Sequence, residues 1–148
     1  MIIQPLQKSD YSQWLPLWHA NMEGSVSDEI TVETWRRICD PASKVGGICA
    51  REDNSADEVG PIIGICHYIL HPTTGNLKDV CYMQDLYVDP AHRRKGIARK
   101  LVTYLAAMAT VQEWARIYWL AEGKNEAAQK LYQSLGLKLD FTLHVLPV

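Results

Sequence analysis

The sequence lacks the patterns that mark metal-binding, redox and membrane-spanning proteins. Its four cysteines contain no C-x-x-C pair and its five histidines no H-E-x-x-H motif, so we expect free thiols and no metal site. No apolar run approaches the roughly 18 residues needed to cross a membrane. The N-terminus also lacks the basic and apolar regions of a signal peptide. We therefore expect a cytoplasmic protein with no membrane partner.

The chain also has little excess of charge of either sign. Its formal net charge is −2 at pH 7, and 47% of its residues are hydrophobic while 22% are charged. These proportions are typical of a globular protein, and the negative net charge argues against a nucleic-acid partner. A length of 148 residues suits one domain with its own hydrophobic core. We therefore expect one domain over residues 1–148.

Periodicity along the chain predicts an α/β fold. Apolar residues recur at helical spacing over residues 11–18, 32–39 and 97–108. The expected strands lie at residues 1–6, 44–52, 60–72, 78–89, 115–122 and, as one or two strands, 137–148. A further short helix over residues 125–136 ends at a glycine. The predicted order is β-α-α-β-β-β-α-β-α-β, and we expect Pro16 to kink or break the first helix.

A cluster of basic residues lies at the start of the helix expected over residues 97–108. Its members are Arg93, Arg94, Lys95, Arg99 and Lys100. The first N–H groups of a helix already carry partial positive charge, so these side chains would repel one another around an empty helix start. Gly96 would let a ligand approach the main chain, and a bound anion would make charge-assisted contacts. The loop alone leaves two interpretations, a site for a phosphate-bearing ligand or a solvated basic helix start.

Two motifs together resemble those of the GNAT N-acetyltransferases. The stretch "QDLYVDPAHRRKGIARKLV" is similar to the family's acyl-coenzyme A signature, whose core Gln/Arg-x-x-Gly-x-Gly/Ala corresponds to residues 93–98. The stretch "NEAAQKLYQSLGL" resembles the second signature, an Asn followed by Leu-Tyr and a Gly-aliphatic step. Ala98 stands where many members carry glycine, but it is also small. The resemblance covers residues 60–141 well and implies a GNAT-like domain, with a mixed, mostly antiparallel sheet flanked by helices.

The resemblance implies that acetyl-CoA is the acyl donor. The residues that would bind it are Leu86, Tyr87, Val88, Arg93, Arg94, Lys95, Gly96, Ile97, Ala98, Arg99, Asn125, Ala128 and Tyr132. Main-chain N–H groups of residues 94–99 would bind the pyrophosphate, and the strand at residues 86–88 would pair with the pantetheine arm. A splay between that strand and the next would admit the arm. Two side chains also have structural interpretations, because Asn125 suits a helix N-cap and Tyr132 suits a half-buried helical tyrosine.

Amide formation from a thioester requires a neutral amine, a donor to the oxyanion and an acid for the leaving thiolate. By resemblance, the N–H of Val88 is the oxyanion donor and Tyr132 is the acid. The base stays open between Asp85 and Glu122. A third option is His67, which equally suits a satisfied core histidine.

The acceptor implied by the resemblance is a primary amine. Aromatic residues and carboxylates in the first two helices suit a cation, and the chain looks most like the branch that includes diamine, polyamine and histone-type acetyltransferases. In polyamine enzymes the position of Gln84 can be a glutamate, whereas an amide cannot act as a base. The alternatives are a protein or peptide N-acetyltransferase and a non-catalytic acyl-CoA sensor. The apolar stretch "FTLHVL" offers an edge for a homodimer.

Overall fold

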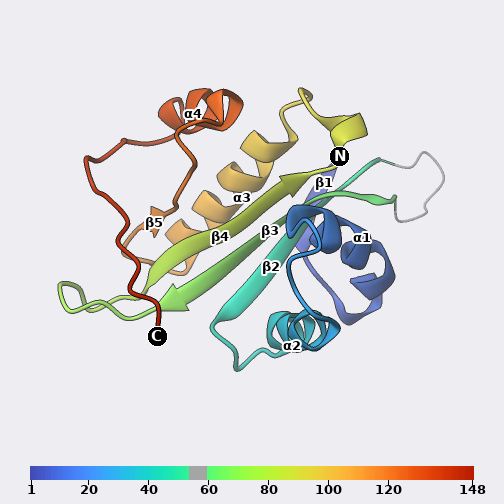
Figure 1. Cartoon of the computed structure of the whole chain (residues 1–148), viewed down its shortest axis with the longest axis horizontal. Coiled ribbons are helices and arrows are strands. Elements are labelled where there is room, and N and C mark those ends of the chain that lie inside the picture. Colours follow the sequence, from blue (N-terminus) through green and yellow to red (C-terminus); the bar gives the residue numbers. More distant parts are fainter. Residues whose placement is uncertain (54–59) are drawn as a thin grey trace.

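The computed structural model describes residues 1–53 and 60–148, whose strands form one sheet (Figure 1). The strands are β1 (Ile2–Pro5), β2 (Val45–Arg51), β3 (Ile62–His71), β4 (Val80–Val88) and β5 (Ile117–Tyr118). Their order across the sheet follows the chain, with antiparallel pairing from β1 to β4 and parallel pairing between β4 and β5. The prediction of a mixed, mostly antiparallel sheet is confirmed.

Helices cover both faces of this sheet. They are α1 (Tyr11–Asn21), α2 (Asp28–Cys39), α3 (Ile97–Val111) and α4 (Glu126–Gln133), with short 3-10 turns at Lys8–Asp10 and Pro90–His92. In Figure 1, α1 and α2 lie on one face and α3 on the other. The helix α1 is continuous through Pro16, because burial of Trp14, Leu17 and Trp18 offsets the roughly 3 kcal/mol that an internal proline costs. None of the helices in the described residues is both long and apolar enough to cross a membrane.

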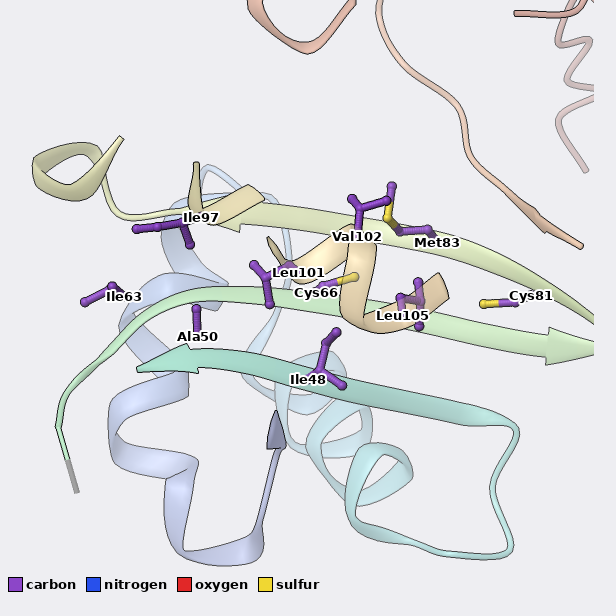
Figure 2. Packing of buried hydrophobic residues seen from close by; sticks show 10 residues of the cluster. All are labelled: Ile48, Ala50, Ile63, Cys66, Cys81, Met83, Ile97, Leu101, Val102 and Leu105. Atoms are coloured by element: carbon purple, nitrogen blue, oxygen red, sulfur yellow. The ribbon is translucent and has the colours of Figure 1, made fainter. Parts of the chain in front are cut away.

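Each face of the sheet has its own buried cluster. On one face, Figure 2 shows Ile97, Leu101, Val102 and Leu105 of α3 packed against side chains of β2, β3 and β4. The cluster on the other face contains Leu6, Trp14, Leu17, Trp18, Cys49, Ile62 and Ile65. On β2, Ile48 and Ala50 belong to the first cluster and Cys49 to the second, as the alternation of side chains along a strand requires. The sheet is therefore held between two apolar layers.

The cysteines are free, as the sequence predicts. Cys49, Cys66 and Cys81 are buried, and Cys39 is half-buried. Burial raises the pKa of Cys49 to about 11 and that of Cys81 to about 12. These thiols therefore stay protonated at neutral pH and act as small core side chains.

A β-bulge in β4 changes the face on which the following residues lie. His67 pairs with Asp85 and Tyr68 pairs with Met83, so Gln84 is an extra residue opposite β3. Met83 belongs to the α3 cluster, and strict alternation would direct Asp85 to the same face. Because of the extra residue, Asp85 instead faces the α1 side of the sheet, where it contacts His67.

The C-terminal part of the chain differs from the predicted order. The strand expected at residues 115–122 is reduced to Ile117–Tyr118, and residues 137–148 form no strand. Residues 137–145 do alternate between apolar and polar side chains, as a strand would. In the described chain, however, no neighbouring strand satisfies their backbone, and their apolar side chains are exposed. The helix α2 also begins earlier than expected, because Ser27 caps it by accepting a hydrogen bond from the N–H of Ile30 (3.3 Å).

Candidate active site

The loop between β4 and α3 has the backbone of an anion site. Arg94 (φ 66°) and Gly96 (φ 74°) both adopt the left-handed conformation, which is uncommon for a non-glycine residue. Gly96 is the N-cap of α3 and makes no side-chain capping bond, and the first turn contains no acidic residue. A Cβ built on Gly96 would have nothing within 4 Å. The first N–H groups of α3 are therefore left for a ligand, and an anion suits them.

The basic side chains around this loop have two different uses. Arg93 donates from Nε to the carbonyl oxygen of Val88 (3.0 Å) and lies over the ring of Tyr87. Arg99 donates from Nη2 to Oγ of Ser134 (2.7 Å), which ties the start of α3 to the end of α4. These two arginines thus have protein partners in addition to any ligand. All five side chains of the cluster, Arg93, Arg94, Lys95, Arg99 and Lys100, are exposed.

A cleft opens where β4 and β5 separate. In the described chain, β5 pairs with β4 only at Cys81 and Tyr82, so the edge of β4 is open from there on. The side chains that line the cleft from the β4 side and α1 include Asn21, Met83, Gln84, Asp85 and Leu86. Those that line it from the β5–α4 side include Trp119, Leu120, Ala121, Glu122, Asn125, Ala128 and Tyr132. The expected catalytic residues Asp85, Glu122 and Tyr132 therefore share one cleft.

Asp85 is held by hydrogen bonds to both carboxylate oxygens. Asn21 donates from Nδ2 to Oδ1 (3.1 Å), and Nδ1 of His67 lies 3.0 Å from Oδ2. The other ring nitrogen of His67, Nε2, accepts from the indole N–H of Trp14 (2.9 Å). His67 is 2% exposed, and protein groups occupy both of its nitrogens. The interpretation of His67 as a satisfied core histidine is therefore confirmed, and its role as a free base is not supported.

The opposite wall of the cleft carries the expected acid. Tyr132 is half-buried on α4, and its ring packs against Trp119 with centroids 5.3 Å apart. Burial raises the pKa of Tyr132 above its ordinary value of about 10, so the phenol is protonated at neutral pH. Asn125 accepts from the N–H of Ala128 (3.0 Å) and is the N-cap of α4, as its structural interpretation predicts. Glu122 is exposed.

Two residues of this site were not identified from the sequence. Asn21 ends α1, and no motif marks it. The sequence shows Trp14 only as an aromatic residue at helical spacing, because its partner His67 lies 53 residues further along the chain. A pattern confined to one helix carries no information about such a pair.

The fold and the site together define an acyltransferase class. An open β4 edge, a cleft beside it and an anion site at the next helix suit a donor with an extended arm and a phosphate group. The sequence model described as the Acetyltransferase (GNAT) family matches residues 7–137. The chain therefore belongs to the GNAT acetyltransferase family and is an acetyl-CoA-dependent N-acetyltransferase.

Named relatives act on different acceptors. The D-amino-acid N-acetyltransferase HPA3 of Saccharomyces cerevisiae is 31% identical over 147 residues, which cover 97% of this chain and 89% of that protein. The structure of a ribosomal-protein-alanine N-acetyltransferase from Brucella melitensis biovar Abortus 2308 superposes with a TM-score of 0.80 at 22% identity, over 100% of both chains. AAC(6')-Iy bound to a bisubstrate analogue gives a TM-score of 0.83 at 19% identity, over 99% of this chain and 97% of the other. At these identities, the two structures support the fold alone.

Proposed function

We propose that this N-acetyltransferase acetylates a cationic primary amine, such as a polyamine, a small amine or a lysine-like side chain. The observation that carries the proposal is the charge of the cleft. Among the described residues that line it are two carboxylates, Asp85 and Glu122, and no lysine, arginine or histidine. Such a lining attracts an ammonium group and offers no partner for an anionic acceptor.

The donor is proposed to lie along the open edge of β4. Asp89 donates its N–H to the carbonyl oxygen of Ile63, on the β3 side of the sheet. Because N–H groups alternate in direction along a strand, that of Val88 points to the opposite side, where β5 no longer pairs. Leu86, Tyr87 and Val88 would pair with the pantetheine arm at this edge.

The rest of the donor would continue to the loop at the start of α3. The left-handed backbone and uncapped N–H groups of residues 94–99 suit the pyrophosphate, which the exposed Arg94 and Lys95 would help to neutralise. Ile97 and Ala98 would contribute main-chain N–H groups, and the small Ala98 leaves them accessible. Asn125 and Ala128 would contact the arm from α4, since both line the cleft.

The proposed chemistry is direct attack of the amine on the thioester in a ternary complex. A lysine-like amine has a pKa of about 10.4, so only about one molecule in 2,500 is neutral at pH 7, a barrier of about 4–5 kcal/mol without assistance. Asp85 would attract the ammonium and accept its proton, with Glu122 as the second candidate on the opposite wall. The N–H of Val88 would donate to the oxyanion, and the protonated Tyr132 would donate to the leaving thiolate.

A D-amino acid is the second candidate acceptor, because the yeast relative is named for that activity. An amino acid brings a carboxylate as well as an amine, and a bound carboxylate needs a cationic or N–H donor partner. The cleft lining described above supplies no cationic side chain. This difference in charge makes the two candidates separable by one assay.

The test is an acetyl-transfer assay with four groups of acceptors: polyamines, D- and L-amino acids, aminoglycosides and lysine-containing peptides. Release of free thiol from acetyl-CoA is measured for each acceptor at equal concentration. We expect the highest kcat/KM with a polyamine or a lysine-like amine. A clear preference for D-amino acids would replace the proposal by the second candidate. Turnover with peptides alone would restrict the proposal to a lysine-like side chain, and turnover with aminoglycosides alone would contradict it.

We also propose a cytoplasmic homodimer that uses the C-terminal residues 137–148. Leu137, Leu139, Phe141, Leu143 and Val145 alternate with polar residues, and all five are exposed in the single chain. An apolar stretch with this alternation is suited to pairing with another strand. Sedimentation equilibrium is the measurement, and a monomer at tens of micromolar would contradict the dimer.

A further inference from the structure

The hydrogen bonds behind Asp85 form a chain that runs from the interior of the protein to the cleft. Trp14 of α1 donates to Nε2 of His67 on β3, and His67 contacts Oδ2 of Asp85 on β4. Asn21, at the last turn of α1, donates to the other oxygen of Asp85. Trp14 is fully buried, and the side chain of Asp85 retains 15% exposure toward the cleft. Of Trp14, His67 and Asp85, only Asp85 lines the cleft.

The donor and acceptor roles in this chain follow from chemistry. An indole nitrogen can only donate a hydrogen bond, so Nε2 of His67 must be the acceptor and carries no proton. In a neutral ring the proton then lies on Nδ1, from which it is donated to Oδ2 of Asp85. Protonation of Nε2 would set two N–H groups against each other at 2.9 Å. Trp14 therefore selects the tautomer of the neutral His67 ring and opposes a proton on Nε2.

We propose that Trp14 and His67 are positioning residues that keep Asp85 an oriented, negatively charged carboxylate for the acceptor amine. With Nδ1–H of His67 on one oxygen and the amide of Asn21 on the other, the carboxylate cannot rotate without losing a bond. If His67 became an imidazolium, it would pair with Asp85 and cancel the charge that attracts the amine. This inference rests on the proposed function of Asp85, and it adds residues that do not touch the substrate.

The surroundings of His67 leave Asp85 as its charged neighbour. The rings of Trp14 and Trp18 from α1 lie 6.0 and 5.5 Å from the imidazole, measured between centroids. From β2, the close neighbour is Gly47, where an added Cβ would come within 3.3 Å of the imidazole. Asp85 from β4 is the titratable group in contact with it among the described residues.

The two tryptophans of α1 provide a matched pair of variants. Their rings stack with centroids 5.5 Å apart, but the indole of Trp18 donates to Oγ1 of Thr31 and not to His67. Trp14→Phe removes the donor to Nε2 and leaves an aromatic ring, whereas Trp18→Phe makes the same change beside it. Comparison of the two separates the lost hydrogen bond from the general cost of altering the aromatic core.

The first measurement is the pH dependence of kcat/KM, expressed as the ratio of variant to wild type. Trp14→Phe removes the N–H group that opposes a proton on Nε2 of His67. For this variant we expect a ratio several-fold lower at pH 5.5 than at pH 8.5. For Trp18→Phe we expect a ratio that does not vary with pH. Equal pH dependence in the two variants would overturn the proposal.

A second pair of variants tests the bond from His67 to Asp85. The amide of His67→Asn can still donate to Oδ2 but cannot become charged in this range, whereas His67→Ala has no donor. We expect His67→Asn to retain kcat within about threefold, and His67→Ala to lose about tenfold or more in kcat with little change in KM for acetyl-CoA. Equal losses in kcat would show that the hydrogen bond does not position Asp85.

Nitrogen NMR of the wild-type imidazole tests the tautomer without any substrate. In the wild type we expect the neutral His67 ring to be protonated on Nδ1, and in Trp14→Phe we expect a larger share of rings protonated on Nε2. A neutral wild-type ring protonated on Nε2 would overturn the inference directly. If the NMR result holds while no acceptor is turned over, the proposed function has failed and the tautomer selection stands.

Discussion

Two regions of the molecule form the two walls of one cleft, and they are built differently. The body, residues 1–53 and 60–118, contains both buried clusters and carries Asp85 and the loop between β4 and α3. The C-terminal segment, residues 119–148, carries Tyr132, Asn125 and Glu122. Among the described residues, none after Leu105 is buried.

The difference shows which part of the site is held in place before a ligand binds. Asp85 is fixed by side chains from α1 and β3, on a strand paired along most of its length. Tyr132 is held by partial burial against Trp119 and by the bond from Arg99 to Ser134 at the end of its helix. Segments with few buried contacts open at low free-energy cost. We therefore expect the body to keep its half of the site without ligand, and the C-terminal segment to be stabilised by the bound donor.

The largest effect is expected from Tyr132→Phe in the C-terminal segment. Loss of a general acid lowers turnover by roughly 10²–10⁴-fold, and we expect kcat to fall by about 10²–10³-fold. The affinity for CoA should stay within about threefold, because the ring remains. Steady-state kinetics and calorimetry are the measurements, and Tyr82→Phe on β4 is the control. Wild-type turnover in Tyr132→Phe would remove the assigned acid.

A pair of leucine truncations compares the two regions directly by stability. Leu101→Ala, in the α3 cluster, should lower the free energy of unfolding by about 2–5 kcal/mol. Leu143→Ala, 66% exposed in the C-terminal segment, should change it by less than about 0.5 kcal/mol at low protein concentration. Urea unfolding at several concentrations is the measurement. A large, concentration-dependent loss for Leu143→Ala would show that a second copy covers this segment.

Gly96→Ala tests whether the loop between β4 and α3 depends on the left-handed backbone conformation at Gly96. At φ 74° an added Cβ is strained, so we expect a loss of about 1–2 kcal/mol in stability or, if the loop shifts instead, about a tenfold loss in CoA affinity. Gly75→Ala is the matched control, because Gly75 also has open space for a Cβ but no left-handed φ. Equal, negligible effects on both quantities would show that the left-handed turn is not required.

The last effect is confined to high pH and comes from the buried thiols of the body. Burial raises the pKa of Cys49 from about 9 in the unfolded chain to about 11 in the folded protein. The contribution of the neutral thiol to folding stability is therefore complete below pH 9 and is lost as the pH rises toward 11. The contribution of Cys49 to the melting temperature should therefore be constant up to about pH 8.5 and fall at higher pH. The fall in melting temperature above pH 8.5 should be smaller in Cys49→Ala than in the control Cys39→Ala, because Cys39 is only half-buried. If the fall is the same in both variants, groups other than Cys49 cause it.

Much of the body was predictable because its signals are local. Turn residues and apolar periodicity predicted the elements from β1 to α3, and Gly96 with its basic neighbours marked the loop at the start of α3. The C-terminal segment was predicted less well for the same reason. Alternation over residues 137–145 predicts a strand, but strand formation also requires a partner edge, which no local pattern supplies.

The sequence by itself determined the order of elements from β1 to α3, the basic, glycine-containing start of α3 and the presence of Asp85 on β4. The tertiary structure alone decided where Asp85 points. The bulge at Gln84 directs it to the α1 face, where Asn21 and His67, 64 and 18 residues away in sequence, donate to its two oxygens. Such contacts depend on how strands pair and helices pack, because residues far apart in the chain become neighbours only when both faces of the sheet are covered.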